Sequence, residues 1–268
     1  MTEVLIHNEC ALERIDTQYR PLIEAAWEGM VACCGDRLRE IRLQGSIARG
    51  DARTGLADLD MLALVDASSL EEENQCLAEL ATKLGAGTDL VSRFDLEAVD
   101  ANALGPFRRF VLSSDSVCVR GVDTLTLPVQ SMERTALAQL VTPDPSTMLP
   151  DYLAWAEELT SANEGERRFA SRIIGKDLLK ILRGVLLVRG APYEVAIPRI
   201  AAQVSSVAPE AADIAGDLFA LYSEPTTDVA SIRRAATAAA CFLDGCREVA
   251  FLRSAGDVES AVLEGPAS

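Results

Sequence analysis

Histidine is almost missing from this 268-residue sequence, in which His7 is the single example. The seven cysteines are scattered along the chain, and none of them forms a Cys-x-x-Cys pair. A zinc site built from histidine and cysteine ligands is therefore not expected. The odd number and irregular spacing of the cysteines instead predict reduced thiols, as in a cytosolic protein.

Positive charge is also scarce, since 25 Lys and Arg residues stand against 41 Asp and Glu residues and the formal net charge is −16. This balance argues against binding over a broad surface to nucleic acid or to an anionic membrane, because both are negatively charged. It is compatible with a cationic small substrate, with metal ions, or with an acidic solvated surface, the most frequent case.

Long apolar segments are absent as well. No window contains eighteen uncharged apolar residues, and the longest candidate is interrupted by Arg183 and Arg189, so we expect no transmembrane helix. The segment MTEVLIHNECALERID has early acidic residues and no long apolar core, so we expect no signal peptide and a cytoplasmic location. Aromatic residues make up only 5% of the chain, which leaves Ala, Leu, Val and Ile to build the core.

The first half of the sequence alternates between helix and strand patterns. Helices are predicted over residues 9–34, over a segment that begins at a Ser cap and ends at Gly85, and over residues 103–112. Strands are predicted over residues 40–45, 58–65, 88–99 and 116–121.

From Pro128 onward strand patterns nearly disappear. Helices are predicted over residues 129–141, 148–162, 164–189, 194–207, 210–222 and 228–253. The segment TPDPSTMLPD is expected to be a connector, and the final SAGDVESAVLEGPAS is expected to fray. The change from a mixed to an all-helical pattern predicts two domains, residues 1–125 and 126–268.

The predicted strand over residues 58–65 carries Asp58 and Asp60 inside an apolar run. Side chains alternate along a strand, so both carboxylates point to one face with their Cα atoms roughly 6.5–7 Å apart. Two like charges at this distance are costly unless a cation lies between them. Carboxylate oxygens suit Mg²⁺, which takes its other ligands from water and substrate phosphates. The pair alone is a weak signal, because acidic pairs on an edge strand are usually solvated.

The segment QGSIARG precedes this strand and predicts a strand that ends at Gly45, followed by a short helix capped by Ser46. A glycine lets the backbone approach a ligand closely, and the free N–H groups at a helix start attract phosphate. Arg49 in the first turn of that helix would close on the same phosphate oxygens. The segment is not a Walker A loop, because it lacks Gly-Lys-Ser/Thr.

The segment RFDLEAV places Arg93, Asp95 and Glu97 on one face of the third strand. Asp95 lies between Phe94 and Leu96 and offers a third carboxylate to the site begun by the first pair. Glu97 shares that face and is the alternative general base, although the apolar-Asp-apolar pattern favours Asp95.

This combination of Gly-Ser, a spacer, Asp-x-Asp on the next strand and apolar-Asp-apolar on a later strand resembles the DNA polymerase β-like nucleotidyltransferase superfamily, in particular its minimal and antibiotic-modifying members. The resemblance covers residues 41–122 and includes DSVCVRGVD, which is similar to the family's closing apolar-Gly strand end. It implies an α+β fold with a small mixed-sheet nucleotidyltransferase core and flanking helices, followed here by a C-terminal α-helical bundle.

The resemblance also implies roles for the residues of these motifs. Asp58 and Asp60 would hold Mg²⁺ that bridges the nucleotide phosphates. Gly45 and Ser46 would cradle the β- and γ-phosphates, assisted by Arg49.

The implied reaction is attack of a hydroxyl on the α-phosphorus of a nucleoside triphosphate, with ATP as the expected co-substrate and pyrophosphate as the leaving group. Asp95 would complete the metal site or activate the acceptor hydroxyl, and Glu97 remains the alternative base. Positioning and charge neutralisation carry most of the catalysis in such a transfer.

The predicted helix over residues 164–189 carries the one strong cationic stripe of the chain, formed by Arg168, Arg172, Lys176, Lys180 and Arg183. One interpretation is a solvated face with salt bridges to acidic neighbours. The other is that Lys176, or else Lys180, reaches the triphosphate from the second domain, since a helical C-terminal domain commonly does so in the family.

Three functional hypotheses follow. The first is adenylylation of a small hydroxylated acceptor, with an aminoglycoside-like antibiotic as the leading candidate, and the acidic balance favours it. The second is an adenylyltransferase that modifies a protein, of the antitoxin type, while the net charge argues against nucleic acid as acceptor. The third is a non-catalytic nucleotide-binding module. A monomer and a homodimer are both compatible with the sequence.

Overall fold

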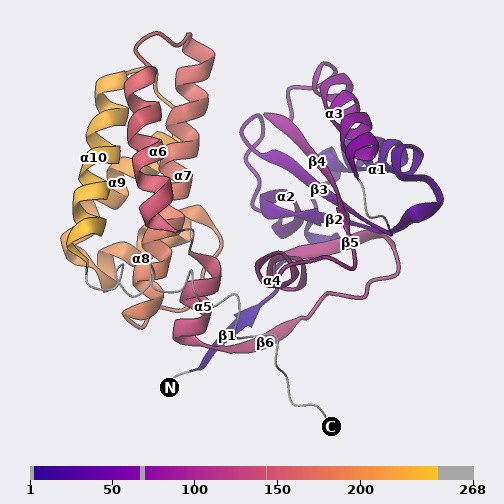
Figure 1. Cartoon of the computed structure of the whole chain (residues 1–268), viewed down its shortest axis with the longest axis horizontal. Coiled ribbons are helices and arrows are strands. Elements are labelled where there is room, and N and C mark those ends of the chain that lie inside the picture. The colour runs from indigo at the N-terminus through magenta and orange to yellow at the C-terminus, as the bar shows by residue number, and fades with distance from the viewer. Residues whose placement is uncertain (1–2, 67–69, 143, 247–268) are drawn as a thin grey trace. The chain divides into compact units, whose positions relative to one another are not determined.

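The computed structural model describes residues 3–66, 70–142 and 144–246 (Figure 1). The chain divides into two compact units, one formed by Ile6–Gln130 and the other by Met1–Leu5 together with Ser131–Ser268. The division falls after Gln130, Glu3–Leu5 group with the helical unit, and the domain bounds 1–125 and 126–268 stay a prediction. None of the helices within the described ranges combines the length and the apolar character that crossing a membrane requires.

A four-stranded mixed sheet with the order β4-β3-β2-β5 forms the centre of the first unit. Its strands are β2 (Leu38–Gln44), β3 (Asp58–Val65), β4 (Arg93–Asp100) and β5 (Ser116–Gly121). Strand β2 is antiparallel to both β3 and β5, whereas β3 and β4 run parallel. The predicted α+β class with a small mixed sheet is confirmed.

The α-helices that accompany this sheet in the described residues are α1 (Arg20–Cys34), α2 (Gly45–Arg49), α3 (Glu71–Gly85) and α4 (Pro106–Ser114). Helices α1 and α3 lie side by side (Figure 1), and their apolar side chains bury Leu59 and Met61 of β3. The alternate β3 residues Leu62 and Leu64 pack on the opposite face, against Leu112 of α4. Strand β3 is thus covered by apolar side chains on both faces. Its two carboxylates, Asp58 and Asp60, lie at the first residues of the strand, before the apolar residues Leu62 and Leu64 of the same face.

Several boundaries in this unit differ from the sequence predictions. The helix expected from residue 9 begins at Arg20, because Leu12–Arg14 and Thr17–Tyr19 form separate 3₁₀ turns. Strand β4 begins at Arg93 rather than at residue 88, since Thr88 folds into a turn by accepting a hydrogen bond from the Leu90 N–H.

The two helices α3 and α4 also begin differently from the prediction. Helix α3 begins at Glu71 after Leu70, which supplies no side-chain cap, and the expected Ser cap falls on residues outside the described ranges. Helix α4 spans Pro106–Ser114 instead of residues 103–112, because proline fits the first turn of a helix.

A two-stranded sheet pairs β1 (Glu3–His7) with β6 (Val129–Glu133). Neither strand was predicted, and the helix expected over residues 129–141 begins only at Arg134. Burial alternates along β1, but the outward-facing Leu5 is apolar and 63% exposed, so the sequence lacks the alternation of apolar and polar residues that indicates a strand.

The second unit is otherwise helical, as predicted. Its α-helices are α5 (Arg134–Val141), α6 (Pro145–Glu158), α7 (Glu164–Val188), α8 (Ile197–Val207), α9 (Ala212–Ser223) and α10 (Val229–Gly245), with a 3₁₀ turn at Pro209–Ala211. Helix α6 begins at Pro145, inside the segment expected to be a connector. The segment expected to fray lies outside the described residues.

Helix α7 is the centre of the helical unit. It begins with a capping box in which the side chains of Asn163 and Glu166 each bond the other residue's backbone N–H. Its apolar side packs against the neighbouring helices through fully buried residues such as Leu178, Leu182 and Leu186. Trp155 is partly buried and packs against this core as well.

Cys33 of α1 and Cys76 of α3 form a disulfide with their Cα atoms 5.8 Å apart. The prediction of reduced thiols is therefore wrong for this pair, and the cysteine pattern no longer supports a cytosolic location. Spacing could not show the bond, because the two cysteines meet only when α1 and α3 pack together.

Candidate functional site

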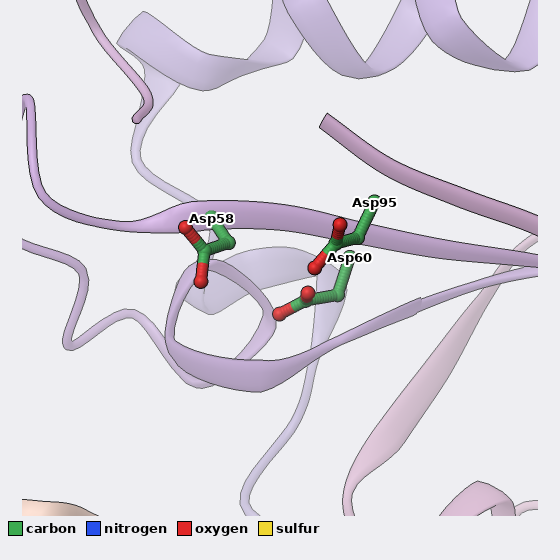
Figure 2. A group of neighbouring side chains, drawn as sticks. All are labelled: Asp58, Asp60 and Asp95. Carbon is green, nitrogen blue, oxygen red and sulfur yellow. The ribbon is translucent and has the colours of Figure 1, made fainter. Parts of the chain in front are cut away.

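Asp58, Asp60 and Asp95 come together at one end of the parallel β3–β4 pair (Figure 2). Each contributes one carboxylate oxygen to a group whose members all lie within 4.8 Å of one another. Asp58 is buried, whereas Asp60 and Asp95 are half-buried. The structure thus brings the three predicted carboxylates into one cluster, and their use as metal ligands stays a prediction.

The strand register explains why these three side chains meet. Asp60 lies directly opposite Asp95 on the neighbouring strand, and Asp58 is two residues before Asp60 on the same face. Leu59, between the two β3 carboxylates, points to the other face and is fully buried among the side chains of α1 and α3. A one-residue slip of either strand would turn its carboxylate into that apolar layer, so the core fixes the cluster.

Ser92 and Arg93 donate hydrogen bonds to carboxylates of the cluster. The Ser92 hydroxyl donates to Asp58 Oδ1. Arg93 Nη2 donates to Asp95 Oδ2 at 2.5 Å, and Arg93 Nε lies 3.7 Å from Asp58 Oδ1. One guanidinium therefore contacts carboxylates on both strands, and the three acids and Arg93 together carry a formal charge of −2.

Gly45 begins helix α2 and approaches Asp60 closely. Its backbone has a φ of +76°, a conformation that side-chain-bearing residues rarely adopt. A Cβ atom at this position would lie 2.8 Å from Asp60 Oδ2, closer than real Cβ contacts. Ser46 follows in the same turn and is half-buried. The turn and the carboxylate cluster therefore touch at a place where only glycine fits.

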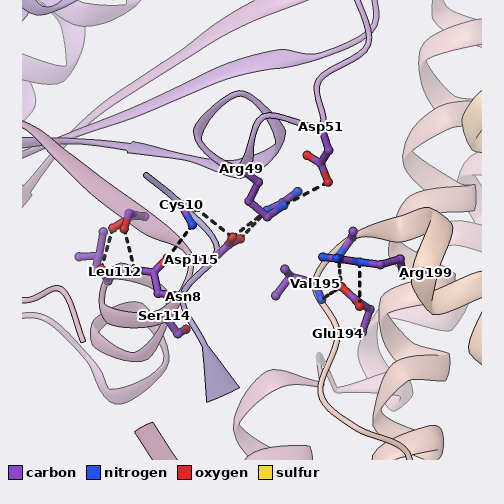
Figure 3. Close-up of polar contacts among 12 residues, drawn as sticks. Asn8, Cys10, Arg49, Asp51, Leu112, Ser114, Asp115, Glu194, Val195 and Arg199 are labelled. Carbon is purple, nitrogen blue, oxygen red and sulfur yellow. Dashed lines mark hydrogen bonds and ion pairs between the residues drawn. The ribbon is translucent and has the colours of Figure 1, made fainter. Parts of the chain in front are cut away.

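Arg49 lies at the end of α2, and its guanidinium is held by Asp115 (Figure 3). Arg49 Nη1 lies 2.7 Å and 2.9 Å from the two Asp115 carboxylate oxygens, and Nε lies 3.4 Å from Asp51 Oδ2. Burial alone would lower the pKa of Arg49, but the charges of Asp115 and Asp51 outweigh it and raise the pKa above its ordinary value. The predicted contact of Arg49 with phosphate would have to compete with this pair.

The segment after β1 is fastened to the same place (Figure 3). The Asn8 side chain donates to the backbone carbonyls of Ser113 and Ser116, and its own oxygen accepts from the Cys10 N–H at 2.9 Å. The Cys10 thiol lies 3.5 Å from Asp115, and burial together with that charge raises its pKa. Asp115 thus holds the last residue of α2, and Asn8 fastens the segment after β1 to the chain on either side of Asp115. No local pattern singles them out, because their partners are far away in the sequence.

Glu97 lies outside the carboxylate group. It occupies the next position on the same face of β4, opposite Leu62, and its Oε1 is 2.7 Å from Arg108 Nη1. Both side chains of this ion pair are more than two-fifths exposed. The structure therefore associates Asp95, and not Glu97, with Asp58 and Asp60.

Two members of the cationic stripe of α7, Lys180 and Arg183, make polar contacts within the helical unit. Arg183 is buried and donates to the Val141 carbonyl at 2.8 Å. Lys180 bonds Asp177 at 3.1 Å, and its pKa is lowered because burial outweighs that neighbouring charge. Lys176 is half-buried on the same helix, and its predicted reach to a triphosphate stays a prediction.

Comparisons with known proteins place few constraints on this site. No family model and no curated protein sequence matches the chain. One similar solved structure is the spectinomycin adenyltransferase AAD(9) from Enterococcus faecialis, determined with ATP and spectinomycin. The two chains share 11% sequence identity with a TM-score of 0.48, over 82% of this chain and 98% of the other. A similarity of this size does not establish a family.

Proposed function

We propose that this chain is a Mg²⁺-dependent nucleotidyltransferase that transfers AMP from ATP to a hydroxyl of a small acceptor and releases pyrophosphate. The observation that supports this function is the convergence of Asp58, Asp60 and Asp95 beside the Gly45 turn. Carboxylates at this spacing repel one another, and the backbone N–H groups at the start of a helix suit the phosphates that such an ion would accompany.

The cluster fits a small divalent cation. Mg²⁺ binds oxygen ligands at about 2.1 Å, so its ligands lie between about 3 and 4.2 Å from one another in an octahedron. The three carboxylate oxygens lie within 4.8 Å of one another, and small side-chain rotations would bring them into that range. Three protein ligands leave open positions for water and phosphate oxygens, which Mg²⁺ characteristically keeps.

In the proposed reaction the acceptor oxygen attacks the α-phosphorus of ATP, and the bond between that phosphorus and the bridging oxygen to the β-phosphate breaks. When bound, Mg²⁺ supplies positive charge that neutralises the phosphate oxygens as pyrophosphate departs. The backbone of Gly45 and Ser46 would bind the β- and γ-phosphates, and Asp58 and Asp60 would hold the ion.

The proton of the acceptor hydroxyl passes to a carboxylate of β4. Asp95 lies beside Asp58 and Asp60 and would serve as this base or as the third metal ligand. Glu97 is the alternative base, and it would first have to leave its ion pair with Arg108. Lys176 of the helical unit would add positive charge to the triphosphate. The net charge of −16 favours a cationic acceptor such as an aminoglycoside.

The experiment that tests this function measures pyrophosphate release by the full chain, with ATP or GTP, Mg²⁺ and a panel of aminoglycosides. We expect release with ATP and a suitable acceptor, and its loss in the folded variant Asp60→Asn. Asp66→Asn is the matched control, because Asp66 directly follows β3 but pairs with Arg39 away from the cluster.

Two further assays separate the other candidates. Label transferred from radioactive ATP to a protein in a cell extract would identify a protein acceptor instead. No binding of ATP in the presence of Mg²⁺ by calorimetry would leave a module without this activity, and full activity of Asp60→Asn would reject the site.

A further inference from the structure

Arg93 occupies a special position at the start of β4. In the strand register it lies opposite Asp58, two residues before Asp95 on the same face. Its guanidinium contacts both of these carboxylates, with Nη2 at 2.5 Å from Asp95 and Nε at 3.7 Å from Asp58. The side chain is nevertheless 42% exposed, so solvent reaches it and its long stem has room to change rotamer.

The charges at this place set up a competition. Without a divalent ion, three carboxylates within 4.8 Å of one another repel, and Arg93 supplies positive charge between two of them. A divalent ion bound by the same three carboxylates would coordinate oxygens of the carboxylates that Arg93 contacts. Two cations cannot both approach Asp95 closely without repelling each other.

We propose that Arg93 is an exchangeable counter-ion, which holds the carboxylates of Asp58 and Asp95 when no divalent ion is bound and releases Asp95 when an ion binds. This inference rests on the proposed function, because it needs the cluster to be a metal site. The exchange keeps β3 and β4 from being pushed apart by their own charges in the metal-free protein. Its cost is a lower metal affinity than three carboxylates alone would give.

The ion pair between Arg108 and Glu97 offers a matched comparison. It also joins an arginine to a carboxylate of β4, at 2.7 Å, and its side chains are 43% and 49% exposed. The pair of Arg93 and Asp95 has a similar distance and 42% exposure on each side. The two pairs differ in that Glu97 lies outside the carboxylate group.

The test is a titration of the full chain with Mn²⁺, in which the electron paramagnetic resonance signal of the free ion measures binding. We expect Arg93→Gln to bind Mn²⁺ about tenfold more tightly than the wild type, because one repelling charge is removed. Arg93→Lys keeps the charge but loses the planar fork that reaches both carboxylates, and an increase of about two- to threefold is expected. Arg108→Gln should leave the affinity unchanged.

Thermal unfolding supplies a second readout. Arg93→Gln should unfold at a lower temperature than the wild type without metal, and Mn²⁺ should raise its unfolding temperature by more than it raises that of the wild type. If Arg93→Gln does not fold, Arg93→Lys carries the test.

One result to look for is that the wild type binds Mn²⁺ while both Arg93 variants bind it with the same or a lower affinity. That result would overturn the exchange and leave the metal site intact. An equal gain in affinity in Arg108→Gln would overturn it too, since a general loss of positive charge would then explain the effect. If neither the wild type nor Arg93→Gln binds Mn²⁺, the proposed function fails and the exchange fails with it.

Discussion

Replacing Gly45 with alanine tests whether the turn before α2 and the carboxylate cluster form one site. The added Cβ would lie 2.8 Å from Asp60 Oδ2, so the carboxylate must retreat by roughly half an ångström to reach the ordinary contact range that begins at 3.4 Å. The left-handed φ of +76° adds backbone strain of roughly 1–2 kcal/mol for a residue with a side chain. Both effects act on the edge where the metal is proposed to bind.

Gly55→Ala separates these two effects. Gly55 has a nearly identical φ of +74° in the same connection between β2 and β3, but its Cβ would meet nothing closer than the Asp89 carbonyl at 3.5 Å. Both variants should lose about 1–2 kcal/mol of unfolding free energy in chemical denaturation. Gly45→Ala alone should also lose Mn²⁺ affinity and at least about tenfold of pyrophosphate release, since displacement of about 1 Å can cost about a hundredfold. Equal losses of affinity and activity in the two variants would refute the link between the turn and Asp60.

Two further predictions concern the support of the site. Asp115→Asn should lower the unfolding free energy by about 2–3 kcal/mol, because the largely buried guanidinium of Arg49 loses a close carboxylate partner and keeps the longer contact with Asp51. Unchanged stability with tighter ATP binding would instead show that Arg49 is a phosphate ligand released by the substitution. Loss of the disulfide in Cys33→Ser, measured by denaturation without reductant, should lower the unfolding free energy by up to about 4 kcal/mol for a separation of 43 residues. Cys118→Ser is the control, because Cys118 is a free cysteine. An equal effect in both cysteine variants would contradict stabilisation by the disulfide between α1 and α3.

The sequence patterns predict the features that depend on local periodicity. The strand over Asp58–Val65 has the predicted bounds, because an apolar run interrupted by two acids at a spacing of two residues fits a strand with one polar end. The same periodicity places Asp58, Asp60 and Asp95 on one face, and the parallel pairing of β3 with β4 then brings them together.

The features that sequence patterns miss depend on partners that are distant along the chain. Strands β1 and β6 pair with each other, and the disulfide joins Cys33 of α1 to Cys76 of α3. The same is true of Arg49, which the motif assigns to phosphate and the fold pairs with Asp115. A motif indicates which residue types share a site, whereas the register and packing decide which of them touch.

A Mn²⁺ titration of the wild type beside Asp60→Asn and Asp66→Asn tests the central claim most directly. The claim predicts that the wild type and Asp66→Asn bind Mn²⁺ with the same affinity, that ATP changes the spectrum of the bound ion, and that Asp60→Asn weakens binding by at least about tenfold, which corresponds to about 1.4 kcal/mol. Equal Mn²⁺ affinity in all three proteins would contradict the claim that Asp58, Asp60 and Asp95 form one metal site.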